Sequence, residues 1–167
     1  MAGLDPKPVS ASAISGHVYK VFPNDLNAHN TVFGGVIMAE CDRLALVVAE
    51  RHSGYVCVTA SIDSIHFVAP AKHGDTLVFH CSVNRAWTSS MEIGIQVQAE
   101  NSYTGEIRPI VSFFSTFVAL DEHNQPAPVP PVLAESSVEQ RRFRDAGIRR
   151  EQRLATRKAL EANLKTG

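Results

Sequence analysis

An aspartate stands on the apolar face of an expected helix. Residues 36–54 predict a long helix, and on it Asp42 shares one face with four apolar side chains, Met38, Ala45, Leu46 and Ala49. A carboxylate on such a face costs free energy unless it is hydrogen-bonded or used in a reaction. From this pattern alone, a catalytic carboxylate and a structural buried carboxylate are equally good interpretations.

Two glycines and an asparagine precede this helix. Gly34 and Gly35 would let a substrate approach the free N–H groups of the first turn, which favour negative charge such as a developing oxyanion. Asn27 lies 15 residues before Asp42 in a loop rich in Asn and Asp, and its amide could orient a water or a carbonyl group. Taken one at a time, these residues are better explained as parts of a tight turn.

Histidines and cysteines form no pattern typical of a metal site or a nucleophile. Five histidines do not cluster at the spacing of metal ligands: His29, His52, His66, His73 and His80. The sequence also contains no GxSxG, GxxxxGK[ST] or GxGxxG segment. Three scattered cysteines in apolar runs predict free, buried thiols in a reducing compartment: Cys41, Cys57 and Cys81.

Strand patterns flank the expected helix. A short strand is expected over residues 17–22, and the helix is expected to stop at Gly54. Four further strand patterns follow, over residues 55–68, 77–83, 91–100 and 110–120. The third alternates strictly between apolar and polar residues, which predicts a sheet with one dry and one wet face, and the nearly continuous apolar fourth predicts a central strand. One buried helix against an antiparallel sheet gives an α+β fold class.

The ends of the chain differ in composition from its middle. Residues 1–14 predict a flexible N-terminus, residues 15–124 a folded domain, and residues 125–133, with four prolines, a stiff linker. Residues 134–167 predict a basic helical extension, since they carry nine Lys/Arg and five Asp/Glu against seven and twelve before them. A solvated helix, an arm packed on a neighbouring subunit, or a contact for phosphates would each explain this extension. We expect a chain that ends near Pro131 to fold.

Composition and charge exclude several classes of protein. The 167 residues suit one domain, and 44% apolar with 20% charged residues is typical of a globular protein. A net charge of −1 gives no reason to expect nucleic acid or an anionic membrane as a partner. The sequence shows neither a signal-peptide core nor an apolar run long enough to span a membrane, so we expect a cytoplasmic protein.

Several segments together resemble acyl-CoA thioesterases of the hotdog superfamily, in particular the YciA-like and brain acyl-CoA hydrolase group. The first, residues 23–42, matches P-x-D-x-N, a short loop, [FH]-G-G, and an acidic residue seven positions after the second glycine. The second, residues 64–75 (SIHFVAPAKHGD), matches a strand and turn of that family. The small-residue turn at residues 88–90 and the strand at residues 113–121 match as well. The resemblance covers about residues 17–122, and the linked spacing is specific.

The resemblance implies a hotdog fold, in which a curved antiparallel sheet wraps one long helix. It implies partners of two kinds, an acyl-CoA substrate and further copies of the chain, which join as dimers and as a trimer of dimers. It also implies hydrolysis of acyl-CoA to a free acid and CoA. No metal or cofactor is required, because coenzyme A is part of the substrate and the product.

The resemblance also implies roles for individual residues. Asp42 matches the catalytic acidic residue, as general base or nucleophile, and Asn27 matches the catalytic asparagine. The backbone N–H near Gly35 matches the group that polarises the thioester carbonyl. Four residues fall where the family binds CoA: Phe67, Arg85, Ser89 and Ser90.

Two other functions fit the same fold. A hotdog dehydratase or hydratase would use a catalytic histidine with an acid, but no histidine stands beside Asp42 on the helix. A protein that binds or senses acyl-CoA without cleaving it would have no use for a base, so the set Asn27, Gly35 and Asp42 favours hydrolysis.

Overall fold

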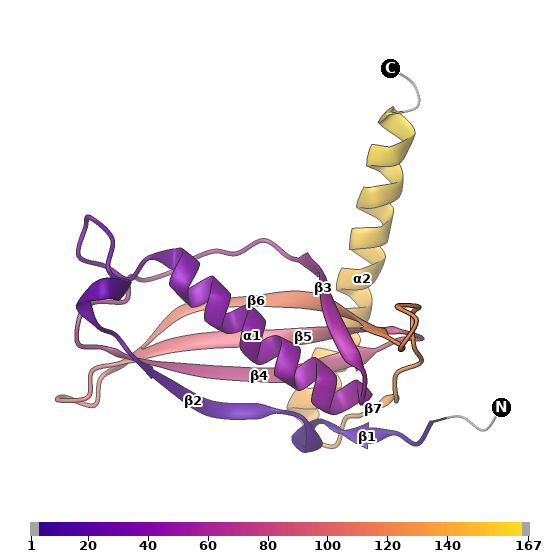
Figure 1. The fold of residues 1–167 in the computed structure, drawn as a ribbon, viewed down its shortest axis with the longest axis horizontal. Helices are drawn as coiled ribbons and strands as arrows, with labels where there is room; N and C mark the ends of the chain where they lie inside the picture. Colours follow the sequence, from indigo (N-terminus) through magenta and orange to yellow (C-terminus); the bar gives the residue numbers. More distant parts are fainter. Residues whose placement is uncertain (1–3, 165–167) are drawn as a thin grey trace.

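One long helix crosses one face of a five-stranded antiparallel sheet (Figure 1). The computed structural model describes residues 4–164. The strand order is β2-β4-β5-β6-β3, with these bounds: β2 Ile14–Lys20, β3 Val56–Ile62, β4 Thr76–Ala86, β5 Ser90–Glu100 and β6 Ile107–Leu120. This arrangement confirms the predicted α+β class with one central helix.

The central helix α1 runs over Gly34–Ser53, as predicted. It ends because Gly54 adopts a left-handed conformation with φ 77°, in which its N–H donates to the Glu50 carbonyl at 2.8 Å. The apolar stripe of α1 is buried against the inner face of the sheet: Ile37, Cys41, Leu44, Ala45, Val48 and Ala49. Burying each large apolar side chain in such a stripe stabilises the fold by roughly 1.5–3 kcal/mol.

The inner face of the sheet is the dry face that the alternating pattern predicts. Its buried side chains on β4 and β5 are Leu77, Phe79, Cys81, Val83, Met91, Ile93, Ile95 and Val97. The strand that the sequence predicts to be central is β6. It is an interior strand, paired with β5 on one side and with β3 on the other, and the middle strand of the five is β5.

The edge strand β3 is shorter than the strand expected over residues 55–68. Its pairing with β6 shifts register between Thr59 and Ser61 and ends where Ile62 faces Ser115. Residues 63–68 have no regular secondary structure. The β-branched composition of the segment does not reveal where its partner strand diverges, because that depends on tertiary pairing.

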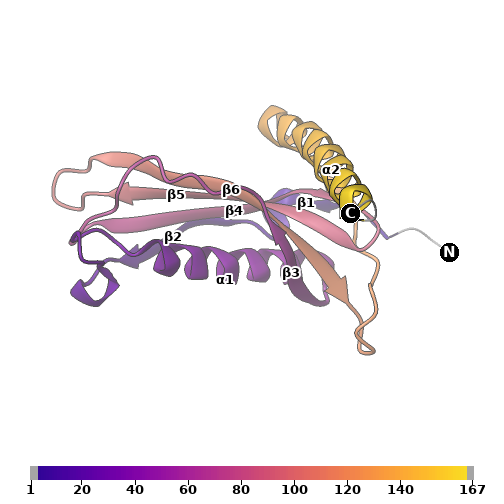
Figure 2. The same cartoon turned by 90° about the horizontal axis from the view of Figure 1, so that it is seen from above.

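A second helix, α2 (Ser137–Leu164), lies on the face of the sheet opposite α1 (Figure 2). The prediction that this face is wet is therefore wrong at Glu92, whose side chain is 0% exposed beneath α2. The Arg149 guanidinium lies 3.6 Å from the centroid of the Phe114 ring on the same face. Farther along, α2 extends beyond the sheet (Figure 1), and Leu160 and Leu164 are exposed there.

The N-terminal segment and the proline-rich segment pack together beside the end of α1. Strand β1 (Lys7–Pro8) pairs in parallel with β7 (Val132–Leu133). A short 3₁₀ turn, η1 (Val9–Ala11), follows β1, and Val9 is buried. The sequence predicts a flexible terminus and a stiff linker, whereas the structure packs these two segments against each other. Composition does not reveal this contact, because the two segments are distant in sequence. Residues 1–3 and 165–167 of the predicted terminal segments lie outside the described residues.

Candidate active site

Asp42 is held by a residue of the edge strand. Its Oδ1 accepts a hydrogen bond of 2.7 Å from the Thr59 hydroxyl on β3. The Asp42 side chain is half-buried on α1. A bond to Oδ1 fixes the rotation of the carboxylate, so Oδ2 is the oxygen that could act on a water or a thioester.

Thr59 is a candidate site residue that the sequence analysis missed. It lies in the run VCVTASI, where a β-branched residue is typical of any strand. Its contact with Asp42 joins residues 17 positions apart, and it depends on the position of β3 beside α1. The run itself carries no signal that separates Thr59 from its neighbours.

Aromatic rings crowd the glycines at the start of α1. A Cβ on Gly34 would lie 3.3 Å from Phe67 Cζ, and one on Gly35 would overlap the Phe33 ring. A larger residue at either position would therefore require one of these rings to shift. The first N–H groups of a helix have no partner within the helix, so this end of α1 favours a developing negative charge. A mostly apolar cavity of about 350 Å³ opens here, lined among others by Gly34, Phe67 and Ile110.

Asn27 orders the loop before α1. Its Oδ1 accepts hydrogen bonds from the backbone N–H of His29 (2.8 Å) and of Thr31 (3.3 Å), and its Nδ2 donates to Thr31 Oγ1 at 3.0 Å. Within residues 4–164 of one chain, no hydrogen bond joins Asn27 to Asp42. Within the described part of one chain, Asp42 is therefore hydrogen-bonded to Thr59, whereas Asn27 is bonded within its own loop.

The candidate CoA residues fall in two places. Val68, next to Phe67, donates its N–H to the Ile110 carbonyl near one end of β6, whereas the Ser89 carbonyl accepts from the Ala119 N–H near the other end. Ile110 and Ala119 are nine positions apart on β6, or roughly 30 Å at about 3.3 Å per residue. One chain does not bring Phe67 to the other three residues.

Arg85, Ser89 and Ser90 lie together beside α2. The Arg85 guanidinium lies 4.5 Å from the centroid of the Phe143 ring, and Ser90 Oγ accepts a hydrogen bond from Arg150 Nη1 at 3.1 Å. The loop between β4 and β5 thus carries a cluster of cationic and hydroxyl groups, which suits recognition of phosphate groups.

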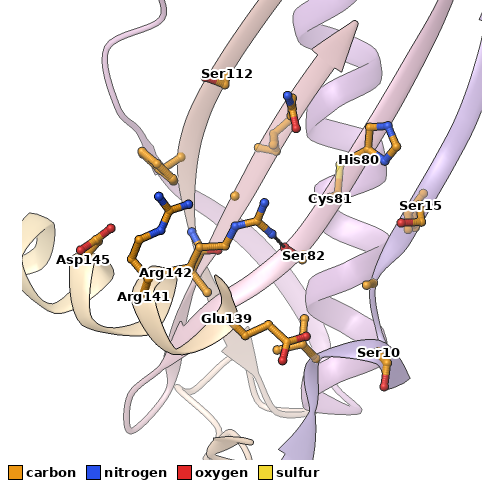
Figure 3. Close-up of a pocket in the computed structure, with 18 of the residues that line it drawn as sticks. Ser10, Ser15, His80, Cys81, Ser82, Ser112, Glu139, Arg141, Arg142 and Asp145 are labelled. Carbon is orange, nitrogen blue, oxygen red and sulfur yellow. Dashed lines mark hydrogen bonds between the residues drawn. The ribbon is translucent and has the colours of Figure 1, made fainter. Parts of the chain in front are cut away.

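A larger cavity of about 810 Å³ lies between α2 and the outer face of the sheet (Figure 3). Arg141 and Arg142 line it from α2, and Arg142 Nη1 donates to Ser82 Oγ at 3.5 Å. Because α1 and α2 lie on opposite faces of the sheet (Figure 2), the sheet stands between this cavity and Asp42.

Three further features of the described residues concern metal binding, cysteine reactivity and membrane insertion. In residues 4–164, no group of three or more His, Cys, Asp and Glu side chains could hold a metal ion. The three cysteines are free and buried, and burial raises the pKa of Cys81 to about 12, so its thiol stays protonated at neutral pH. Neither described helix is long and apolar enough to cross a membrane.

Comparison with known proteins points to one family. The sequence profile of the thioesterase superfamily matches residues 29–106. An uncharacterized acyl-CoA thioester hydrolase of Bacillus subtilis, YkhA, is 42% identical over 120 residues, which cover 72% of this chain and 70% of YkhA.

Solved structures agree with this match. An acyl-CoA hydrolase from Bacillus cereus superposes with a TM-score of 0.88 at 39% identity, over 97% of this chain and 98% of that one. An acyl-CoA hydrolase from Staphylococcus aureus superposes with a TM-score of 0.87 at 37% identity, over 95% and 96%. These likenesses extend over α2 and confirm the predicted hotdog fold. By its sequence and its fold, the chain belongs to the thioesterase superfamily.

Proposed function

We propose that this protein hydrolyses acyl-CoA thioesters to a free carboxylic acid and CoA, with Asp42 as the reacting carboxylate. The observation that carries the proposal is the bond between Thr59 and Asp42, on a helix whose N-terminus opens beside an apolar cavity. This combination offers an oriented base, a positive helix end and a place for an acyl chain.

The mechanism follows from these groups. The thioester carbonyl would point at the N-terminus of α1, where a backbone N–H near Gly35 donates to the developing oxyanion. One such donor is typically worth roughly 3–4 kcal/mol in the transition state. Asp42 either removes a proton from the attacking water or attacks the carbonyl itself to form an anhydride that water then opens. In both routes the C–S bond breaks, the CoA thiolate leaves, and water supplies the oxygen of the acid.

The Staphylococcus aureus relative supports this assignment of residues. Its structures include complexes with butyryl-CoA and CoA, and variants in which an aspartate, an asparagine or a threonine is replaced by alanine. In that chain the asparagine precedes the aspartate by 15 positions and the threonine follows it by 17. These are the intervals between Asn27, Asp42 and Thr59 in this chain.

Self-association would complete the site. Strand β3 is an edge strand, and it carries exposed apolar side chains, of which Val56 is 66% exposed. Such edges are normally paired or covered. A solved acyl-CoA thioesterase that superposes on 92% of this chain, with a TM-score of 0.88 and 35% identity, is hexameric. We propose a dimer as the minimal unit and three dimers as the full assembly, with Asn27 of one chain facing Asp42 of the next.

The CoA part of the substrate would extend from the helix N-terminus toward the loop between β4 and β5. Phe67 would contact it at the reacting end, and Arg85, Ser89 and Ser90 would contact its polar groups. A span of roughly 30 Å separates these two places on one chain, so the contacts would come from two subunits.

A cytoplasmic location fits the thiols and one relative. A rat relative, 33% identical over 146 residues that cover 85% of this chain and 38% of the relative, is a cytosolic acyl coenzyme A thioester hydrolase. Free cysteines are typical of a reducing compartment.

Direct measurement of CoA release tests the function. Purified protein is mixed with acetyl-, hexanoyl- or palmitoyl-CoA, and the free thiol is read with a thiol reagent. Asp42→Ala should lower turnover by about 10²- to 10⁴-fold while the fold and CoA binding persist. The matched control is Glu40→Gln, which removes a carboxylate from the same helix. Glu40 Oε1 lies 3.2 Å from His17 Nε2, and Glu40 Oε2 lies 3.5 Å from Arg43 Nη1. Turnover of Glu40→Gln should stay within roughly twofold of wild type.

Three outcomes would overturn the proposal. Binding of acyl-CoA without release of a thiol would indicate a sensor. Loss or gain of water across an acyl double bond, again without a thiol, would indicate a dehydratase or hydratase. Near-normal turnover of Asp42→Ala would show that Asp42 is not the reacting carboxylate.

A further inference from the structure

A buried carboxylate fastens α2 to the outer face of the sheet. Glu92 on β5 is 0% exposed and accepts hydrogen bonds from Arg149 Nη2 (2.7 Å), Asn84 Nδ2 (3.1 Å) and Arg153 Nη2 (2.9 Å). Burial alone would raise the pKa of Glu92, but these hydrogen bonds outweigh it and hold the pKa below its usual value. The carboxylate is thus fully paired, as a buried charge must be.

Arg153 links this cluster to a second carboxylate. Its Nη1 donates to Asp63 Oδ2 at 2.6 Å, while its Nη2 serves Glu92. Asp63 directly follows β3, and its backbone N–H donates to the Phe114 carbonyl on β6 at 2.9 Å. One guanidinium therefore holds the end of the edge strand against the sheet.

The segment that Arg153 holds carries both parts of the candidate site. Thr59, four residues before Asp63, donates to Asp42. Phe67, four residues after Asp63, lies against Gly34 at the start of α1. Within the sheet β3 pairs with β6 alone. After it, Asp63 and Val68 each donate one backbone hydrogen bond to β6, and residues 64–67 between them are irregular, so the sheet constrains this stretch less than it would a paired strand.

We propose that Arg153 is a positioning residue for the reaction, acting through Asp63. The ion pair fixes the end of β3, so that the Thr59 hydroxyl orients the Asp42 carboxylate. This inference rests on the proposed hydrolysis at Asp42. It gives α2 a role in turnover, although α2 lies on the far side of the sheet from α1 (Figure 2).

The variants that test it leave Glu92 paired. Asp63→Asn removes one charge from a residue whose side chain is 22% exposed and keeps the bond between Arg153 and Glu92. Arg153→Gln removes the link itself but keeps Arg149 on Glu92. Arg157→Gln is the matched control, because Arg157 lies one turn farther along α2 and pairs with Glu161 on the surface.

Turnover and stability are measured on the full-length assembly with the fastest of the three acyl-CoA substrates. We expect Asp63→Asn and Arg153→Gln to lower kcat by about tenfold with little change in KM, since a misplaced catalytic group costs rate more than binding. Arg153→Lys, which retains the charge, should recover part of the loss. Arg157→Gln should match wild type, and all variants should keep the wild-type oligomer in light scattering.

A double-mutant comparison separates positioning from general stability. If the ion pair acts through Thr59, Asp63→Asn should lower kcat by less than about twofold further when Thr59 is already alanine. A full second loss in that background would overturn the inference, as would wild-type kcat in both Asp63→Asn and Arg153→Gln. These results would leave the proposed function intact, provided that Asp42→Ala is inactive. An inactive wild type would instead overturn the proposed function and this inference together.

Discussion

The Thr59 hydroxyl lies 2.7 Å from the Asp42 carboxylate, so the edge strand β3 contacts the central helix at the proposed reacting group. A threonine hydroxyl can both donate and accept, but an ionised carboxylate only accepts, and the proton of this bond therefore comes from Thr59. The bond ties the chemistry to the strand through which two subunits would pair.

Thr59→Val should impair turnover because it keeps the shape of the side chain and removes the donor. Hydrogen bonds to charged groups are worth roughly 1.5–3 kcal/mol, so we expect kcat to fall roughly 10- to 100-fold. Thr59→Ser, which retains the hydroxyl, should stay close to wild type. Steady-state release of CoA measures both variants, and equal rates for Val and Ser would show that the bond does not orient Asp42.

Mixing two inactive variants should restore activity if the site spans two chains. In a dimer of Asn27→Ala with Asp42→Ala, one site carries both lesions and the other carries none. Under random mixing half the dimers are mixed and half their sites are intact, so activity should return to at most about a quarter of wild type. Verified heterodimers without activity would place Asn27 and Asp42 in one subunit or assign them wrong roles.

The buried His52 should make the protein less stable in mild acid. His52 Nε2 lies 3.0 Å from the Pro130 carbonyl oxygen, and its buried Nδ1 has no hydrogen-bond partner among residues 4–164. Burial lowers the pKa of His52 in the folded state, and nearby Lys7 lowers it further. The unfolded chain therefore binds the proton first, and the stability associated with His52 is present above about pH 6.5. It is lost as the pH falls from there toward the folded-state pKa.

His52→Gln tests that pH dependence because glutamine can still donate to Pro130 but does not titrate. Urea unfolding at several pH values between 7 and 5 measures the free energy of unfolding. Wild type should lose up to about 1.4 kcal/mol per pH unit more than His52→Gln in this window. Parallel curves for the two proteins would mean that His52 titrates alike in the folded and unfolded chains.

Two truncations should differ sharply. The sequence alone predicts that a chain ending near Pro131 folds, but in the structure this cut removes β7 and the part of α2 that covers Glu92 and contains the buried Ala146. We now expect that chain to be clearly less stable in thermal unfolding. A chain ending after Ala155 keeps Arg149 and Arg153, and its midpoint should change by no more than about 3 °C. Similar midpoints for the two truncations would show that α2 contributes little to stability.

Local patterns in the sequence were enough to predict much of this fold. The stripe along α1, the stop at Gly54 and the alternation in β5 are short-range signals, and the structure confirms the elements they predict. The position of Asp42 on an apolar helix face was visible for the same reason. The spacing from Asn27 to Asp42 then connected these elements to a family.

Contacts between distant segments could not be read in the same way. Arg149 and Glu92 are 57 residues apart, and Arg153 and Asp63 are 90 apart. A basic helix and an alternating strand each look solvated when they are considered alone, and only their packing against one another buries Glu92. Thr59 was missed for a similar reason, because its partner lies on another element.

The place of α2 in the chain, after the whole sheet, also affects how the protein folds during its synthesis. Every strand of the sheet precedes α2 in the chain, and at about 5–20 residues per second the 28 residues of this helix take a few seconds to synthesise. During that interval the sheet can close over α1 while its other face is bare. That face carries Asn84, Glu92 and Gln96, which water can solvate. Before α2 packs on it, this face is thus mostly hydrophilic apart from Phe114, which lowers the risk that nascent chains aggregate through it.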